Sequence, residues 1–224
     1  LMVAGIFENP KRAFFEALFL TVVVFVLGLL LGVSFENSRL DTVNSYYALS
    51  EVSTIDSIAL GQLSEMSMYN CKDMIFSNIQ LADKIYGESL TLQKYEDSGK
   101  ITDILKIAHK KYDALRTLLW INVINSKEKC KNNVSSVVYL YEYLPENLEE
   151  KAREVVWSRI LFDLKQKEGD KIILIPISVD SNISSLDSLI RNLNITSYPV
   201  VVINEKKVLY NLESVEEIEK YLKQ

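Results

Sequence analysis

The sequence is short of the residues on which most metal sites and many enzyme sites depend. Its 224 residues include only two cysteines, one histidine, seven glycines and four prolines. Two cysteines and one histidine are too few for a structural zinc site of four Cys or His ligands. The sequence also lacks a glycine-rich phosphate loop and the common zinc-protease and serine-hydrolase motifs. It therefore predicts no metal and no cofactor, and it offers no catalytic residue.

The charge balance argues against nucleic acid as a main partner. The chain has 30 acidic and 25 basic side chains, a formal net charge of −5 and no long basic run, whereas nucleic-acid-binding domains carry a basic patch. Hydrophobic residues make up 48% of the chain. This share, with so little glycine and proline, excludes a disordered or collagen-like protein.

One long apolar run predicts a transmembrane helix. Residues 13–33 contain a single ionisable side chain, Glu16. A helix of this length covers about 31 Å, which matches the hydrocarbon core of a bilayer. The lipid bilayer is therefore an expected partner. The alternatives are a buried helix of a soluble protein, which would be more amphipathic, and a cleaved signal peptide, whose apolar region would be shorter.

The flanking charges predict the orientation of this helix. Lys11 and Arg12 precede it, whereas Glu36, Arg39 and Asp41 follow it. The positive-inside rule then places residues 1–12 in the cytoplasm and residues 34–224 outside. We expect a single-pass protein of the cell membrane whose C-terminal domains are extracytoplasmic.

Residues 34–132 are predicted to form a helical region. The clearest helix covers residues 100–129, with an apolar stripe at helical spacing and Lys106, Lys110, Lys111, Asp113 and Arg116 on the other faces. A preceding helix is expected over residues 72–95, and residues 96–100 predict the turn between the two. Residues 40–63 are expected to continue the membrane helix. The expected inward side chains of these two segments are Met74, Ile75, Ile79, Ala82, Ile85 and Tyr86, and Val43, Tyr47, Ile55, Ile58 and Leu63.

The two cysteines stand at corresponding ends of this predicted helical hairpin. Cys71 opens its first helix and Cys130 closes its second, so an antiparallel hairpin brings both to the same end. We predict a structural disulfide that closes a loop of about 60 residues and adds about 4 kcal/mol of stability. An outside location supplies the oxidising compartment. Two unpaired thiols and a redox-active pair are the alternatives.

The pattern changes near residue 133, where strand and helix segments begin to alternate. Strands are expected over residues 135–143 and 171–179, and a hairpin over residues 199–204 and 206–211. Helices are expected from Pro145 to residue 167, over residues 184–193 and from Ser214 to residue 222. The predicted order is β-α-β-α-β-β-α, and with the helical region it gives an α+β or α/β fold class.

Residues 133–224 resemble the thioredoxin-like superfamily. The resemblance rests on the element order and on the stretch LNITSYPVVVINEKKVLYNLESVEEIEKYL, in which Tyr198-Pro199 matches the family's cis-proline. It implies a thioredoxin-like domain over residues 133–224, after a cytoplasmic terminus (1–12), a transmembrane helix (13–33) and an extracytoplasmic helical region (34–132).

The chain departs from this family at the redox motif. Where the family has CxxC, this sequence has Leu144, Pro145, Glu146 and Asn147, so dithiol exchange at that position is excluded. The surface near the cis-proline binds extended polypeptides in many members, and this implies a peptide groove formed by Tyr143, Tyr198 and Pro199. Tyr139 and Tyr141 belong to the same candidate set, and plain strand packing is the alternative for all the tyrosines.

These patterns favour a non-catalytic protein-binding or peptide-binding scaffold anchored in the membrane. The first alternative is a thiol-disulfide oxidoreductase that uses Cys71 and Cys130. The second is a structural subunit of a membrane protein complex. His109 is interpreted as a solvated surface residue because two lysines follow it.

Overall fold

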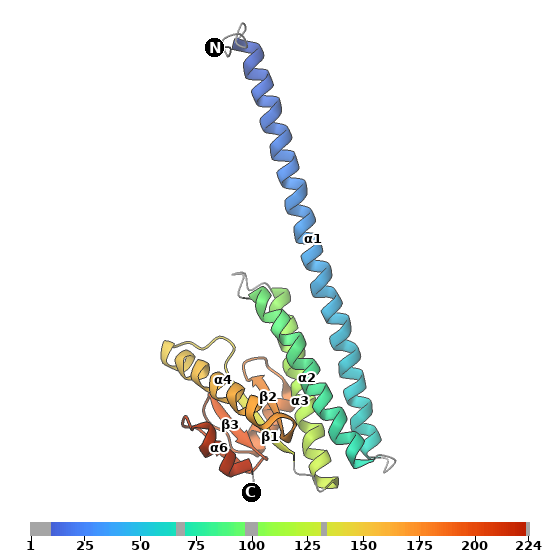
Figure 1. Ribbon diagram of the computed structural model, residues 1–224, viewed down its shortest axis with the longest axis vertical. Coiled ribbons are helices and arrows are strands. Elements are labelled where there is room, and N and C mark those ends of the chain that lie inside the picture. The colour runs from blue at the N-terminus through green and yellow to red at the C-terminus, as the bar shows by residue number, and fades with distance from the viewer. Residues whose placement is uncertain (1–9, 66–69, 97–102, 131–133, 223–224) are drawn as a thin grey trace. The chain divides into compact units, whose positions relative to one another are not determined.

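The computed structural model describes residues 10–65, 70–96, 103–130 and 134–222. These residues form a mixed α+β structure with six α-helices, one 3-10 helix and a four-stranded sheet (Figure 1). The chain divides into two compact units, Leu1–Ala48 and Leu49–Gln224. Helix α1 (Pro10–Glu65) begins in the first unit and ends in the second.

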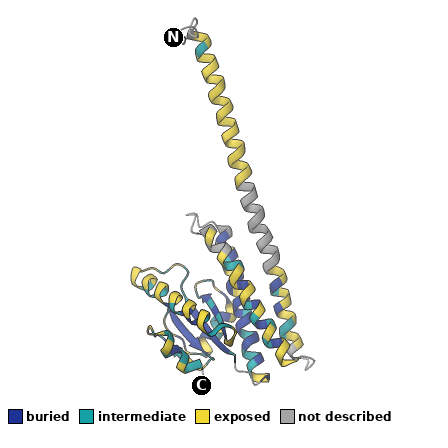
Figure 2. Ribbon diagram, in the orientation of Figure 1, coloured by how far each residue is buried: buried dark blue, intermediate teal, exposed yellow. Residues whose placement is uncertain are grey.

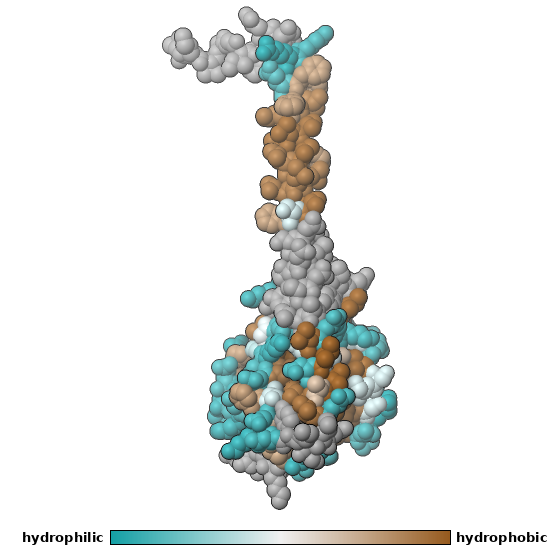
Figure 3. Space-filling view, turned by 90° about the vertical axis from the view of Figure 1, so that its right-hand side faces the viewer, coloured by the Kyte–Doolittle hydropathy of each residue, from teal (hydrophilic) through white to brown (hydrophobic). Residues whose placement is uncertain are grey.

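The first unit contains the apolar part of α1. Over Lys11–Phe35 the mean hydropathy reaches 2.8, and none of this segment is buried against the protein. Figure 3 shows an apolar surface along the face of the segment that it draws. By length and composition this helix can cross a membrane. Arg12 Nε donates to Glu16 Oε1 at 2.9 Å, which pairs the one acidic side chain of the predicted span.

The second unit contains the predicted helical hairpin, formed by α2 (Cys71–Glu96) and α3 (Asp103–Lys129). A disulfide joins Cys71 to Cys130, with the two Cα atoms 5.6 Å apart. The apolar stripe predicted for α3 is buried at every described position: Leu105, Ala108, Tyr112, Leu115, Leu119 and Val123. The predicted turn lies outside the described residues apart from Glu96.

Two predictions about inward faces were wrong. Tyr86 of α2 is 45% exposed, because it lies at the wall of a cavity. On α1, Ile55, Ile58 and Leu63 are exposed, whereas Ser53 and Ser57 are buried; Val43 and Tyr47 fall outside the described side chains.

A close helix contact explains which face of α1 is buried. Asn122 Nδ2 of α3 donates to the carbonyl oxygen of Ser57 at 2.9 Å and lies 3.0 Å from its Oγ. A Cβ on Gly61 would lie 2.8 Å from Asn122 Oδ1. Small residues are therefore required on this face of α1, and hydrogen bonding rather than apolar burial selects it.

The sheet has the strand order β2-β1-β3-β4. Strand β1 (Ser135–Tyr141) is parallel to β2 (Ile172–Ser178) and antiparallel to β3 (Val200–Ile203), which pairs with β4 (Lys207–Leu209). Between them lie α4 (Leu148–Glu168), the 3-10 helix η1 (Gly169–Lys171) and α5 (Ser184–Asn192), and α6 (Val215–Leu222) follows β4. The order of strands and α-helices is the one that the sequence predicts.

Helices cover both faces of this sheet. One core contains Trp157, Leu161 and Leu164 of α4, Ile218 of α6 and alternate residues of the strands, among them Val137, Tyr139, Val201 and Ile203. Helix α3 contacts β1, β2 and α5. Figure 2 shows the resulting pattern, with buried strands and an exposed outer surface on α4.

The β3–β4 turn is held by α3. Asn204 and Glu205 both have positive φ, at 53° and 57°, a conformation that a glutamate rarely adopts. Glu205 Oε1 accepts hydrogen bonds from Trp120 Nε1 at 3.0 Å and Ser136 Oγ at 2.6 Å. Lys127 Nζ donates to Asn204 Oδ1 at 2.7 Å. These contacts offset the backbone cost and join the turn to α3 and β1.

Candidate functional site

Leu144, Pro145, Glu146 and Asn147, which the resemblance aligns with the CxxC motif, lie in the connection from β1 to α4. Asn147 is the N-cap of α4, and its side chain accepts a hydrogen bond from the Glu150 N–H at 2.7 Å. The helix therefore begins at Leu148, and the prediction that it begins at Pro145 was wrong, because the asparagine cap fixes the start. The N–H groups of Tyr143 and Leu144 donate to the two carboxylate oxygens of Asp180, at 3.0 and 3.2 Å. This connection is thus held by hydrogen bonds and contains no thiol.

The Tyr198–Pro199 peptide bond is cis and immediately precedes β3. Pro199 is buried and Tyr198 is partly buried. Burial, with the nearby charges of Asp187 and Glu142, raises the pKa of the Tyr198 hydroxyl above its ordinary value. Tyr198 remains a neutral phenol at physiological pH.

A cavity of about 640 Å³ lies among α2, α3, α4 and the β1–β2 pair. Side chains of Tyr139 and Tyr141 line it from β1, and Tyr143 lines it from the segment that follows. Further lining residues come from the helices and from β2: Tyr86, Leu90, His109, Tyr112, Arg116, Leu119, Leu161, Phe162, Lys165, Leu174 and Pro176. The lining is mostly apolar and aromatic, and a volume of this size is typical of ligand pockets.

The predicted groove residues separate in the structure. Tyr143 lines the cavity together with Tyr139 and Tyr141, whereas Tyr198 and Pro199 are not among its lining residues. Tyr139 also belongs to the core and donates from its hydroxyl to the carbonyl oxygen of Glu154 at 3.2 Å. Its burial raises the pKa of its hydroxyl strongly. The side chain of Tyr139 thus packs in the core of the sheet and also lines the cavity.

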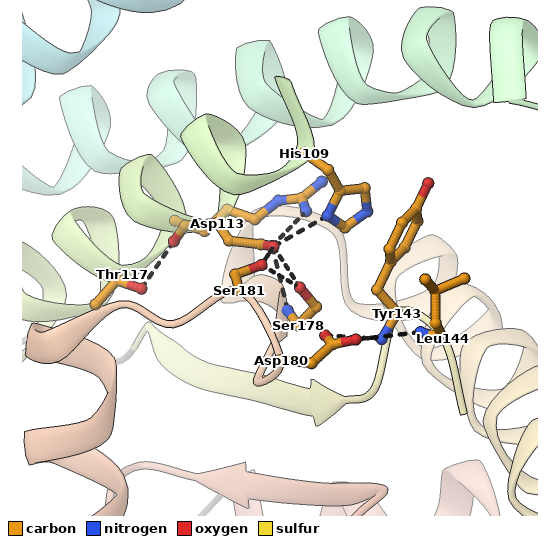
Figure 4. Close-up of polar contacts among 9 residues, drawn as sticks. His109, Asp113, Thr117, Tyr143, Leu144, Ser178, Asp180 and Ser181 are labelled. Carbon is orange, nitrogen blue, oxygen red and sulfur yellow. Dashed lines mark hydrogen bonds and ion pairs between the residues drawn. The ribbon is translucent and has the colours of Figure 1, made fainter. Parts of the chain in front are cut away.

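A buried carboxylate lies behind one wall of this cavity. Asp113 of α3 is 0% exposed and accepts hydrogen bonds on both oxygens (Figure 4). Arg116 Nη1 and the Ser178 N–H donate to Oδ1, at 3.3 and 3.2 Å. His109 Nδ1 and Ser181 Oγ lie 3.0 and 2.6 Å from Oδ2, which also accepts from Ser178 Oγ. The carboxylate connects α3 to the end of β2.

The pKa of Asp113 is lowered in spite of this burial. Removal from water alone would raise the pKa. The hydrogen bond from His109 and the charge of Arg116 outweigh that effect, with smaller contributions from the His109 charge and the Ser178 hydroxyl. Asp113 is therefore ionised and paired at neutral pH. The sequence predicts Asp113 and Arg116 on the faces of α3 outside the apolar stripe; in the structure both side chains are buried, because the two charges pair with each other.

His109 joins the Asp113 cluster to the cavity. Its side chain is only 13% exposed, and its ring lies against the Tyr143 ring, with the centroids 3.9 Å apart and the planes tilted by 35°. The prediction of a solvated histidine was wrong, because Asp113, one turn later on α3, and Tyr143, in the segment after β1, both contact the ring. Because the ionised carboxylate of Asp113 can only accept hydrogen bonds, His109 Nδ1 is the donor in this contact. The other ring nitrogen, Nε2, takes no part in it.

The geometry does not assemble a nucleophilic triad within the described ranges. Ser178 and Ser181 donate to Asp113 rather than to His109, so the imidazole does not activate either hydroxyl as a base would. In the same part of the chain, no group of three His, Cys, Asp or Glu side chains is placed to hold a metal ion. The arrangement instead fixes the wall of a pocket.

A second charged feature lies around the end of β1. Glu154 Oε1 accepts a hydrogen bond from the Glu142 N–H at 2.9 Å. Burial, followed by repulsion from neighbouring carboxylates, raises the pKa values of both Glu142 and Glu154; Asp180 contributes to each. Negative charge in this region is therefore costly to the fold.

The sequence held a partial signal for the buried pair. Arg116 follows Leu105 by eleven residues and therefore lies on the apolar face of α3. Nothing in the sequence pairs Asp113 with Ser178 and Ser181, which are more than 60 residues away.

Compared with protein-family models and with curated proteins, the chain matches none.

Proposed function

We propose that this protein is a membrane-anchored, non-catalytic binding module that captures polypeptide segments in the tyrosine-lined cavity. The observation that carries the proposal is the position of the cavity. It adjoins Tyr143, at the end of β1 where a thioredoxin has its redox motif, and this position has no cysteine. An apolar cavity with aromatic walls at this place supports binding without thiol chemistry.

A thioredoxin-like identity for the C-terminal part is included in the proposal. It is supported by the parallel β1-α4-β2 unit, by the antiparallel β3–β4 hairpin and by the cis Tyr198–Pro199 bond at the start of β3. The final helix α6 packs with α4. A thioredoxin-like topology does not itself determine a function, so the binding proposal rests on the residues of the cavity.

An extracytoplasmic location of residues 34–224 is also proposed. The basic flank at Lys11 and Arg12 supports it, and so does the disulfide, which persists in oxidising compartments. A protease added to intact cells should degrade residues 34–224. Protection of this region in intact cells, with digestion after lysis, would reverse the proposed orientation.

The binding proposal is tested by filling the cavity. Ser158 lines the cavity on α4, whereas Ala152 on the same helix is exposed and does not line it. We expect Ser158→Trp to weaken binding of fluorescent apolar hexapeptides at least tenfold in fluorescence anisotropy, using the full chain in nanodiscs. Ala152→Trp is the matched control and should bind like the parent. Equal binding by the three proteins would place the peptide elsewhere.

Two simple assays separate the alternatives. Reduction of insulin that disappears in Cys71→Ser would support an oxidoreductase and would overturn the non-catalytic proposal. Purification from native membranes in a mild detergent, with a partner retained at fixed stoichiometry in both the parent and Ser158→Trp, would instead support a structural subunit.

A further inference from the structure

Arg116 lies at the wall of the cavity with most of its hydrogen-bond donors unused. Its side chain lines the cavity and is almost fully buried, at 6% exposure for the residue. A guanidinium group has five N–H donors. Among the described residues, its one acceptor is Asp113 Oδ1, which Nη1 reaches at 3.3 Å. Most of its donors are therefore left for whatever occupies the cavity.

Asp113 has no capacity left to satisfy these donors. Its two oxygens already accept hydrogen bonds from five donors, supplied by Arg116, His109, Ser178 and Ser181. A carboxylate offers about four lone-pair sites. The contact with Arg116 is also single and long, whereas a bidentate pair is the strong geometry. The guanidinium is thus kept charged and oriented by Asp113, but it is not saturated.

His109 provides a second polar group at the same wall. Its Nδ1 is used by Asp113, and in the part of the chain that the structure describes no partner is assigned to Nε2. The imidazole lines the cavity beside Tyr143. A ligand oxygen that accepts from Arg116 would lie on the same wall as this nitrogen.

The remaining charges agree with an anionic group in the cavity. Lys165 is a second lining cation, although its Nζ donates to the carbonyl oxygens of Gly169 and Ile172. Asp83 is the one acidic residue among the described lining residues, and its side chain is 58% exposed. The buried lining therefore has aromatic walls and unused guanidinium donors, and the Asp113 carboxylate that balances the charge of Arg116 is not itself a lining residue.

We propose that the cavity binds a carboxylate carried on an apolar or aromatic group, with the carboxylate on Arg116 and the apolar group among the tyrosines. This inference rests on the proposed function and specifies its ligand. The same chemistry has two sources, the C-terminus of a polypeptide and a free aryl or alkyl carboxylic acid. A buried guanidinium that gains a charge-assisted pair supplies both affinity and orientation.

The test compares two probes that differ only in the charged group. Fluorescein-labelled pentapeptides that end in phenylalanine are prepared with a free C-terminal carboxylate and with a C-terminal amide. Binding to the full chain in phosphatidylcholine nanodiscs is measured by anisotropy. We expect the acid to bind at least tenfold more tightly than the amide. N-acetylphenylalanine and 4-phenylbutyrate are then added as competitors of the labelled peptide acid. If they displace it at concentrations equal to or lower than the unlabelled peptide acid requires, the site is assigned to small acids.

Two variants locate the effect. Arg116→Gln should abolish the preference for the acid. Arg153→Gln should retain it, because Arg153 donates to the carbonyl oxygen of Tyr210 and does not line the cavity. Should Arg116→Gln fail to fold, the ratio in the parent and in Arg153→Gln still decides the question. Equal binding of acid and amide would overturn the inference and leave the proposed function intact, whereas no binding of either probe would overturn both.

Discussion

Replacement of Asp113 by asparagine should destabilise the second unit by about 3 kcal/mol. Removing one partner of a buried ion pair costs about 3–5 kcal/mol, because the other charge is left uncompensated. Asparagine keeps an oxygen for Arg116 and for the Ser178 N–H, and both serine hydroxyls can rotate to accept from its amide. These retained bonds place the loss at the lower end of the range. His109 loses its acceptor unless its tautomer changes.

The control is Asp83→Asn in the same helical hairpin. Its carboxylate is 58% exposed and lies 3.9 Å from Lys165 Nζ, so the loss should stay below about 0.5 kcal/mol. Urea unfolding of the full chain in detergent micelles is followed by tryptophan fluorescence, because Trp120 and Trp157 are both fully buried. A loss below about 1 kcal/mol for Asp113→Asn, or losses of equal size in the two variants, would show that the buried ion pair does not stabilise the fold.

The same variant should change the acid limb of the stability curve. The folded state lowers the pKa of Asp113, so its contribution is present above the ordinary carboxyl pKa of about 3.9 and is lost as the pH falls through the lower, folded value. Asp113→Asn should therefore lose less stability than the parent between about pH 5 and pH 2. An unchanged difference between the two proteins across this range would contradict the assignment.

Four further variants probe other contacts by the same unfolding assay. Gly61→Ala should destabilise by about 1–2 kcal/mol because its methyl group meets Asn122, whereas Gly87→Ala, with open space around its Cβ position, should stabilise by about 0.5–1 kcal/mol; the same sign for both would contradict the α1–α3 contact. Glu154→Gln should stabilise the protein by about 0.5 kcal/mol at pH 7. The folded state raises the pKa of Glu154, so the parent is most stable below the ordinary carboxyl pKa and loses stability as the pH rises through the raised, folded pKa. A gain in stability that persists at pH 3 would contradict this explanation. Cys71→Ser should cost about 4 kcal/mol under non-reducing conditions, and a loss below about 1 kcal/mol would show that the disulfide does not constrain the unfolded chain.

The C-terminal fold follows from local sequence patterns. Strands β1 and β2 are continuous apolar runs because helices cover both faces of the sheet, and turn residues separate them from the neighbouring elements. Short-range chemistry therefore determines the order of elements. The start of α4 was less predictable, since Pro145 and Asn147 are both favoured near a helix start and only the hydrogen bond to Glu150 distinguishes them.

The site was much less predictable than the fold. Charged side chains in a helix are assigned to solvent by default, and that default fails where partners distant in sequence neutralise them. Asp113 is buried because β2 and the segment after it supply Ser178 and Ser181. The sequence identifies the tyrosines of β1 as candidates, but the cavity is also lined by Tyr86 of α2 and Phe162 of α4, which are distant in sequence. No local pattern encodes that juxtaposition.

Peptide binding in the cavity is tested most directly by observing which tyrosines respond to a bound peptide. The full chain is labelled with 3-fluorotyrosine, its ¹⁹F resonances are assigned by single Tyr→Phe variants, and the pentapeptide acid is titrated in. We predict that the cavity resonances of Tyr86, Tyr141 and Tyr143 shift with one saturating curve, while those of Tyr198 and Tyr210, which do not line the cavity, stay unchanged. Shifts confined to Tyr198 and Tyr210 would place the peptide at the cis-proline and contradict binding in the cavity.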